Sequence, residues 1–258
     1  MGKAAVILCA GVGSRMGLPP DINKCAAAFG GYSAVGHTLS SLLYAGVSNF
    51  YIVVGHAEDS VRNALSNYIG KIDIKFCINS SYDFHGCNYS LACGVMAVDD
   101  NCTGLIVAEG DSLLHPDSFK QLAEVKQNAA SLIRSPEYIN PKRSVVAAGK
   151  NKIIEKYLYD QSHTGILPAL DDEESILGES MQLWYFSGEP LKKLIRNLNE
   201  YKNLANNSEM PMTESGVYTI NNIEFPITPV MSKHPDDWLN LNTKKDMESA
   251  SELRWLQK

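Results

Sequence analysis

A continuous apolar run that ends in a glycine-rich loop constrains the fold of this chain more than any other feature. The run covers residues 4 to 8, and the loop that follows reads Cys9-Ala-Gly-Val-Gly-Ser-Arg-Met-Gly17. Continuous apolar runs are typical of strands that are covered on both faces of a sheet. Glycines in such a loop let backbone N–H groups approach phosphate oxygens without interference from a Cβ atom. The segment therefore predicts an α/β protein with a phosphate-binding loop after its first strand.

The residues that follow alternate between the patterns of helices and strands. Apolar side chains recur at helical spacing over residues 34–45, and Gly46 marks the end of that helix. Further helices are expected over residues 59–68 and 89–97, and strands over residues 50–54, 73–78 and 104–108. This alternation predicts a three-layer α/β fold with a mixed, mainly parallel sheet and helices on both faces.

The second half of the chain has an α+β pattern. Short strands are expected over residues 144–148, 152–156 and 181–186, and helices over residues 190–199 and 244–256. The polar stretches 160–174 and 202–211 read as insertions, because neither has the length or composition of a linker between domains. We therefore expect a single domain over residues 1–258.

Composition excludes several classes of partner. The chain of 258 residues carries 23 Lys and Arg against 29 Asp and Glu, a net charge of −6, and it has no basic run. Nucleic acid is therefore not an expected partner. The apolar N-terminal stretch is too short to span a bilayer, so no membrane partner and a cytoplasmic location are expected. The six cysteines lack a Cys-x-x-Cys pair, which favours reduced thiols over a zinc site built from cysteines.

Two cations accompany the glycine-rich loop. Arg15 offers paired donors that suit a polyphosphate, and Lys24 could neutralise a phosphoryl oxygen as charge develops. The alternative is a plain glycine turn with both cations solvated. The spacing differs from that of the P-loop, and the third glycine, Gly17, falls one position late for the dinucleotide fingerprint. NAD binding is therefore the weaker interpretation.

Further polar residues follow later strands and helices. Glu109-Gly-Asp111 comes directly after a predicted strand, where Asp111 could hold Mg²⁺ or could simply be a turn residue. Asn88-Tyr-Ser-Leu91 lies at the start of a predicted helix, where Asn88 could read a base edge or cap the helix. Both motifs thus have a functional and a purely structural interpretation.

Taken together, these motifs resemble the signature of the sugar-nucleotidyltransferase superfamily, whose fold is GT-A-like (Rossmann-like). Here Cys9 replaces the first Ala of the signature, and Asn23 replaces the Pro before Lys24. Asn88-Tyr-Ser-Leu91 with Glu109-Gly-Asp111 is most similar to the phosphocholine and phosphonate cytidylyltransferases. The resemblance implies a nucleotide-binding half (1–130) and an acceptor-binding half (131–258). It implies Arg15, Lys24 and Asp111 as catalytic residues, and as nucleotide-binding residues Leu8, Cys9, Ala10, Gly11, Gly13, Ser14, Arg15, Lys24, Asn88, Ser90, Glu109 and Gly110.

The resemblance also extends to the second half. Asn242 stands where the family has a metal-binding Asp, so the implied Mg²⁺ ligands are Asp111 and Asn242. Alternatively, Asn242 is a turn residue and Thr243 caps the last helix. The implied acceptor-binding residues are Lys142, Arg143, Trp184, Glu214 and Trp238, with Trp184, Tyr185, Tyr218 and Trp238 available for an aromatic cage around a quaternary amine. Core packing of the aromatic residues is the alternative, and a phosphonate acceptor would instead use Arg134, Lys142 and Arg143.

The expected reaction is transfer of CMP from CTP to a small phosphate or phosphonate acceptor, with Mg²⁺ as cofactor. Such a reaction depends on positioning and electrostatics and needs no enzyme nucleophile. The alternatives are a sugar-1-phosphate nucleotidylyltransferase that uses UTP or dTTP, and a catalytically silent nucleotide-binding regulator. The oligomeric state is open, with a homodimer among the expectations.

Overall fold

The computed structural model describes residues 2–29, 31–83, 86–160, 162–203, 226–253 and 255. Its largest sheet has nine strands, with seven of them in the order β10-β9-β11-β6-β1-β4-β5. β8 (Ala129–Arg134) pairs with β11 (Ser175–Ser187), and β12 (Thr228–Met231) pairs with β8. Strands from both predicted halves thus share one sheet, because β11 pairs with β6 (Gly104–Glu109).

The first half of the sheet is parallel. β1 (Lys3–Cys9) lies between β4 (Asn49–Val54) and β6, and β5 (Asp73–Ile78) forms the outer strand of this half. All three pairings are parallel, whereas β11 runs antiparallel to β6, to β8 and to β9 (Val146–Gly149). The mixed, mainly parallel α/β sheet predicted from the sequence is confirmed.

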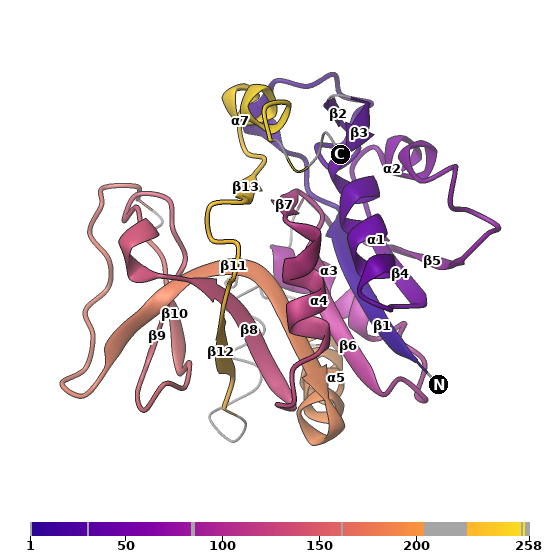
Figure 1. Cartoon of the computed structure of the whole chain (residues 1–258). Helices are drawn as coiled ribbons and strands as arrows, with labels where there is room; N and C mark the ends of the chain where they lie inside the picture. The colour runs from indigo at the N-terminus through magenta and orange to yellow at the C-terminus, as the bar shows by residue number, and fades with distance from the viewer. Residues whose placement is uncertain are drawn as a thin grey trace.

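Helices cover both faces of the sheet. α1 (Ala34–Tyr44) packs beside α4 (Pro116–Ala123) on one face, as Figure 1 shows. α3 (Cys87–Val95) packs beside α5 (Gly188–Asn203), which contacts β6 and β11. Each face has its own core, one containing Leu39 and Phe119 and the other Leu91 and Leu194. The residues of β1 from Ala4 to Cys9 are buried between these layers.

The ends of the helices follow local capping chemistry. The side chain of Ser33 caps α1 by accepting a hydrogen bond from Gly36 N, and the chain leaves α1 through Gly46 at φ 83°. α7 (Lys244–Ala250) begins with a capping box formed by Thr243 and Asp246. The interpretation of Thr243 as a helix cap is therefore confirmed, although this helix ends at Ala250 and not at residue 256.

Several elements differ from the expected boundaries. α2 (Glu58–Ala64) is shorter than predicted, and α4 and β8 were not expected. The strand expected over residues 152–156 is wrong, because Asn151 and Lys152 have φ values of 50° and 60° and form a turn before β10 (Lys156–Leu158). Within the part of the chain that is described, no helix has the length and apolarity needed to cross a bilayer.

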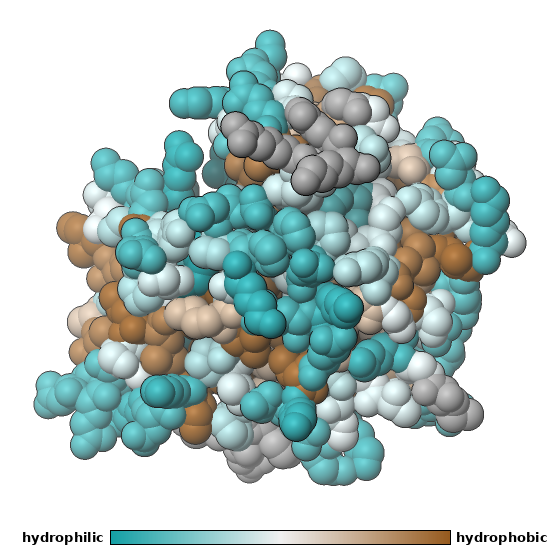
Figure 2. Space-filling view, viewed as in Figure 1, coloured by the Kyte–Doolittle hydropathy of each residue, from teal (hydrophilic) through white to brown (hydrophobic). Residues whose placement is uncertain are grey.

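Two short pairs of strands lie outside the large sheet. β7 (Ser112–Leu114) pairs antiparallel with β13 (Trp238–Asn240), and β2 (Ala28–Phe29) pairs with β3 (Tyr32–Ser33). Figure 1 shows β13 and α7 on the same side of the sheet as the end of β7. The C-terminal segment thereby meets the segment that follows Asp111. The face of the molecule around these elements is mainly hydrophilic (Figure 2).

Candidate active site

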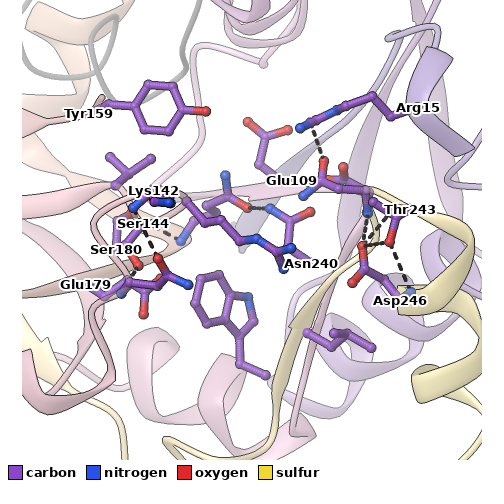
Figure 3. Close-up of a pocket in the computed structure, with 18 of the residues that line it drawn as sticks. Arg15, Glu109, Lys142, Ser144, Tyr159, Glu179, Ser180, Asn240, Thr243 and Asp246 are labelled. Atoms are coloured by element: carbon purple, nitrogen blue, oxygen red, sulfur yellow. Dashed lines mark hydrogen bonds between the residues drawn. The ribbon is translucent and has the colours of Figure 1, made fainter. Parts of the chain in front are cut away.

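A pocket of about 740 Å³ lies beyond the carboxyl ends of β1 and β6. Its lining combines residues of the glycine-rich loop and of the turn after β6 with residues of β11 and β13. Figure 3 shows Arg15 and Glu109 on one side of this pocket and Lys142, Tyr159 and Glu179 on the other. The carboxyl edge of the parallel strands is where open α/β sheets bind their ligands. The pocket is therefore the candidate active site.

Lys24 and Asp111 form an ion pair at the loop side of the pocket. Asp111 is almost fully buried, at 5% exposure, so its carboxylate depends on this partner. Burial alone would lower the pKa of Lys24, but its interactions with Asp111, Cys25 and Glu109 together outweigh that effect and raise the pKa above its ordinary value. Lys24 is therefore positively charged throughout the neutral pH range, as contact with a phosphate requires.

Asn23 holds the glycine-rich loop in place. Its buried amide Nδ2 donates to the carbonyl oxygens of Cys9 (2.8 Å), His56 (2.9 Å) and Gly11 (3.2 Å). Its Oδ1 accepts from Cys25 N at 2.9 Å. Asn23 thus ties the loop to the end of β4 and positions the adjacent Lys24. In the sequence, Asn23 stands out only as a substitution in the family signature, and no local pattern indicates this role.

Glycine is required at two positions around the ion pair. Gly13 has φ 64°, and a Cβ atom there would lie 3.0 Å from both Cβ and Cδ of Lys24. A Cβ atom on Gly110 would lie 2.4 Å from Cys9 Sγ and 2.8 Å from the carbonyl oxygen of Leu8. Only glycine therefore fits at position 110, whereas a side chain at position 13 would press on Lys24.

The predicted loop residues fall into two groups. Leu8, Cys9 and Ala10 are buried, so their side chains belong to the core and any contact with a ligand would have to come from their backbone. Gly11 and Ser14 are exposed. A role for each in nucleotide binding stays a prediction.

Arg15 brings the loop into contact with the C-terminal segment. Its Nη2 donates to Asn242 Oδ1 at 2.9 Å, and both residues line the pocket. Because the amide is neutral, this contact leaves the charge of Arg15 uncompensated by Asn242. The assignment of Asn242 as a metal ligand stays a prediction, while Asp111 and Glu109 place two carboxylates in the same lining.

Arg134, Glu179 and Trp238 occupy the far side of the pocket. Arg134 Nε donates to Glu179 Oε2 at 2.7 Å, and Glu179 is buried. The guanidinium lies 4.5 Å from the ring centre of Trp238, in a cation–π contact. Lys142 and Arg143 line the same region. Among the described residues, neither Lys142 nor Arg143 forms an ion pair, so this region carries net positive charge.

Outside the glycine-rich loop, three predicted site residues have buried side chains away from the pocket. Trp184 has no exposed surface and donates from Nε1 to Tyr157 Oη at 3.1 Å, so its assignment to acceptor binding is wrong and it belongs to the core. Asn88 is fully buried in the first turn of α3 and does not line the pocket, and the capping residue of that helix is Gly86. Ser90 is also buried and accepts from Asn79 Nδ2 at 2.9 Å.

The other residues considered for an aromatic cage lie in different surroundings. Tyr185 is buried at 7% exposure, and Glu214 and Tyr218 lie outside the described residues. Trp238 does line the pocket, but Arg134 covers its ring. Among the described residues, the expected aromatic cage is therefore not assembled.

The fold of this chain is shared by solved nucleotidyltransferases. The chain resembles the inositol-1-phosphate CTP transferase of T. maritima with a TM-score of 0.73 and 16% identity, over 97% of this chain and 94% of that one. It resembles the CTP:phosphocholine cytidylyltransferase LicC of Streptococcus pneumoniae with a TM-score of 0.68 and 14% identity, over 100% of this chain and 99% of that one. At these identities the likeness establishes the fold.

The chain belongs to the family described as a domain of unknown function, DUF6564, whose model matches residues 37–254. Curated relatives are nucleotidyltransferases, which confirms the resemblance noted in the sequence. The CTP:phosphoglutamine cytidylyltransferase of Campylobacter jejuni is 29% identical over 134 residues, 50% of this chain and 51% of the relative. The CMP-5'-(3-aminopropyl)phosphonate synthase of Streptomyces rubellomurinus is 26% identical over 163 residues, 62% of this chain and 25% of the relative. The chain thus matches a quarter to about half of the length of these relatives.

Proposed function

We propose that this chain is a nucleotidyltransferase that transfers CMP from CTP to a small phosphonate or phosphate acceptor and releases pyrophosphate. The observation that carries the proposal is the Lys24–Asp111 pair beside the glycine-rich loop, with Arg15 in the same pocket lining. Cations fixed next to a phosphate-binding loop stabilise the charge that develops during phosphoryl transfer. The choice of CTP is supported by the names of the C. jejuni and S. rubellomurinus relatives.

In the proposed reaction, an acceptor oxygen attacks the α-phosphorus of CTP and pyrophosphate leaves. A phosphonate or phosphate oxygen is already ionised at neutral pH, so the enzyme needs no general base. Lys24 and Arg15 would hold the phosphates in line for attack and balance their charge. Asn23 would hold the loop and Lys24 at fixed positions relative to each other. The residues therefore act through position and charge.

The carboxylates of the pocket suit a divalent cation. Asp111 and Glu109 provide the hard oxygen ligands that Mg²⁺ prefers, and both line the loop side of the pocket. When bound there, Mg²⁺ would neutralise phosphate oxygens and favour departure of pyrophosphate. Asn242 would add its amide oxygen or hold a water ligand only if Arg15 turned away, because its Oδ1 accepts from Arg15 Nη2.

The acceptor is expected to carry negative charge beyond its reacting phosphonate or phosphate. Arg134 already fills the face of Trp238 that a quaternary amine would use. Lys142 and Arg143 add two further cations to the same region, while Glu179 is neutralised by Arg134. This arrangement supports an acceptor with an additional acidic group over phosphocholine.

The proposal is tested by measuring pyrophosphate release with Mg²⁺ and each of the four nucleoside triphosphates. The acceptors are phosphonoformate, phosphoglutamine, hydroxyethylphosphonate, 2-aminoethylphosphonate, phosphocholine and glucose-1-phosphate. We expect CTP to be preferred and an acidic acceptor to exceed phosphocholine. Preference for phosphocholine would contradict the assignment of the acceptor, and CTP binding without turnover of any acceptor would support a regulatory role.

A double variant tests the acceptor side of the pocket. Lys142→Ala with Arg143→Ala should raise the KM for the acceptor by roughly 100-fold or more and leave the KM for CTP unchanged, because each of the two lost charge-assisted contacts costs about 1.5–3 kcal/mol. Lys126→Ala, a change at an exposed lysine outside the pocket, is the matched control. An equal rise in both KM values would place the two cations on the nucleotide.

One alternative activity has a specific observation in its favour. The bifunctional protein GlmU of Corynebacterium aurimucosum is 29% identical over 131 residues, 50% of this chain and 26% of the relative. A putative glucose-1-phosphate thymidylyltransferase of Bacillus anthracis shares the fold, with a TM-score of 0.68 and 18% identity over 98% of this chain and 95% of that one. A sugar-1-phosphate nucleotidylyltransferase is therefore the second candidate. Turnover of glucose-1-phosphate with UTP or dTTP, without turnover of CTP, would favour it.

A further inference from the structure

Two histidines and an aspartate form a cluster behind the β7–β13 pair, outside the pocket lining. His115 and Asp117 lie at the start of α4, whereas His234 comes from the segment that leads into β13. One ligand atom from each of the three side chains lies within 4.8 Å of the other two. Segments more than 100 residues apart in the sequence thus place three metal-binding side chains together.

The ligand atoms of the cluster lie close together, although the planes of the two imidazole rings are nearly parallel. Asp117 Oδ2 lies 3.8 Å from His115 Nδ1 and 3.6 Å from His234 Nε2. The two imidazole rings are stacked, with their centres 3.9 Å apart. All three side chains retain solvent access, which gives an ion a path to the site.

Neighbouring groups orient these ligands. Asp237 Oδ2 lies 3.6 Å from His234 Nδ1, longer than a hydrogen bond, and a small approach would let it accept from Nδ1–H and leave Nε2 for an ion. Tyr44 Oη donates to Asp117 Oδ1 at 3.3 Å, which leaves Oδ2 facing the histidines. His115 Nδ1 accepts from Asp117 N at 3.2 Å, so its lone pair already points toward the start of α4. A bound ion would replace that last hydrogen bond.

We propose that His115, Asp117 and His234 bind a zinc ion, with water completing the coordination. Two imidazoles and a carboxylate suit Zn²⁺ better than Mg²⁺ or Ca²⁺, which prefer oxygen ligands. With metal–ligand distances of about 2.0–2.2 Å, the ligand atoms of a tetrahedral site lie roughly 3.3–3.5 Å apart. To close the site, Asp117 would move by a few tenths of an ångström, and the two stacked rings would tilt apart so that their lone pairs converge on the ion.

The zinc ion would fix one wall of the pocket from behind. It would join α4 to the segment of residues 234–237, which continues directly into Trp238 and β13. β13 places Trp238, Leu239 and Asn240 in the pocket lining. The zinc site is thus structural, and its presence does not depend on the proposed reaction.

The test is titration of the metal-free protein with Zn²⁺ alone, in competition with a chromogenic chelator. We expect one ion per chain, with affinity lowered at least about 100-fold by His115→Ala, His234→Ala or the nearly isosteric Asp117→Asn. Co²⁺ bound in place of Zn²⁺ should give the intense visible bands of tetrahedral coordination, and His234→Ala should abolish them. His163→Ala, at an exposed histidine outside the cluster, is the matched control and should bind normally.

Two further variants test whether zinc binds to other groups of the protein. Cys87→Ser removes the exposed thiol and Asp111→Asn removes a pocket carboxylate, and both should retain the ion. Zn²⁺ should raise the melting temperature of the unaltered protein but not of His234→Ala, because an ion bound only by the folded state stabilises it. Normal binding by the three cluster variants, or loss of binding in Cys87→Ser or Asp111→Asn alone, would overturn the proposal.

Discussion

Replacing Asn23 with alanine should destabilise the protein and loosen the glycine-rich loop together. The Asn23 amide group has two hydrogens, so the three carbonyl oxygens around Nδ2 share two donors, and Oδ1 accepts one further bond. At about 1 kcal/mol for each of these three bonds, Asn23→Ala should lower the free energy of unfolding by about 3 kcal/mol. Urea unfolding followed by circular dichroism measures this change.

The same variant should weaken CTP binding, because the carbonyl oxygens of Cys9 and Gly11 lose the group that positions them. Asn23→Asp should be more damaging than alanine, since it keeps the acceptor for Cys25 N but places a carboxylate against three carbonyl oxygens. Asn63→Ala, on the exposed side of α2, should change stability by less than about 0.5 kcal/mol. A loss below about 1 kcal/mol for Asn23→Ala, with unchanged CTP affinity, would refute the proposed role.

Two further predictions concern the ion pair and the loop. Lys24→Met should reduce turnover by at least about 100-fold, and it should also destabilise the fold by about 3 kcal/mol because Asp111 stays buried without its partner. Adding Asp111→Asn should restore most of the stability and none of the turnover; recovered activity would exclude a chemical role for Lys24. Gly13→Ala and Gly17→Ala both force alanine to positive φ, at 64° and 63°, so both should cost about 1 kcal/mol. In unfolding and kinetic assays, only Gly13→Ala should also lower turnover, because its Cβ would press on Lys24 whereas the space beside Gly17 is open; equal kinetic losses would contradict this reasoning.

Much of the parallel half of the sheet follows from local patterns. The apolar run of β1, the glycines after it and the helical spacing of α1 each report burial or backbone freedom within a few residues, and the structure places these elements as expected. The loop cations and Asp111 were also recognisable, because a charged residue at the end of a buried strand lies at the carboxyl edge of the sheet. These inferences depend on the order of residues over short distances.

Local sequence patterns did not predict the contacts between distant segments. The aromatic run containing Trp184 could face a ligand or the core, and its position on β11, with β6 and β8 on either side and helices on both faces, buries it. Arg15 contacts Asn242, 227 residues away in the sequence, and the cation–π contact joins Arg134 to Trp238, which follows more than 100 residues later. The local sequence pattern indicates where a strand or helix lies. Which residues its side chains contact depends on which strands become neighbours. That choice is made by packing of the whole sheet, which here places the C-terminal segment over the glycine-rich loop.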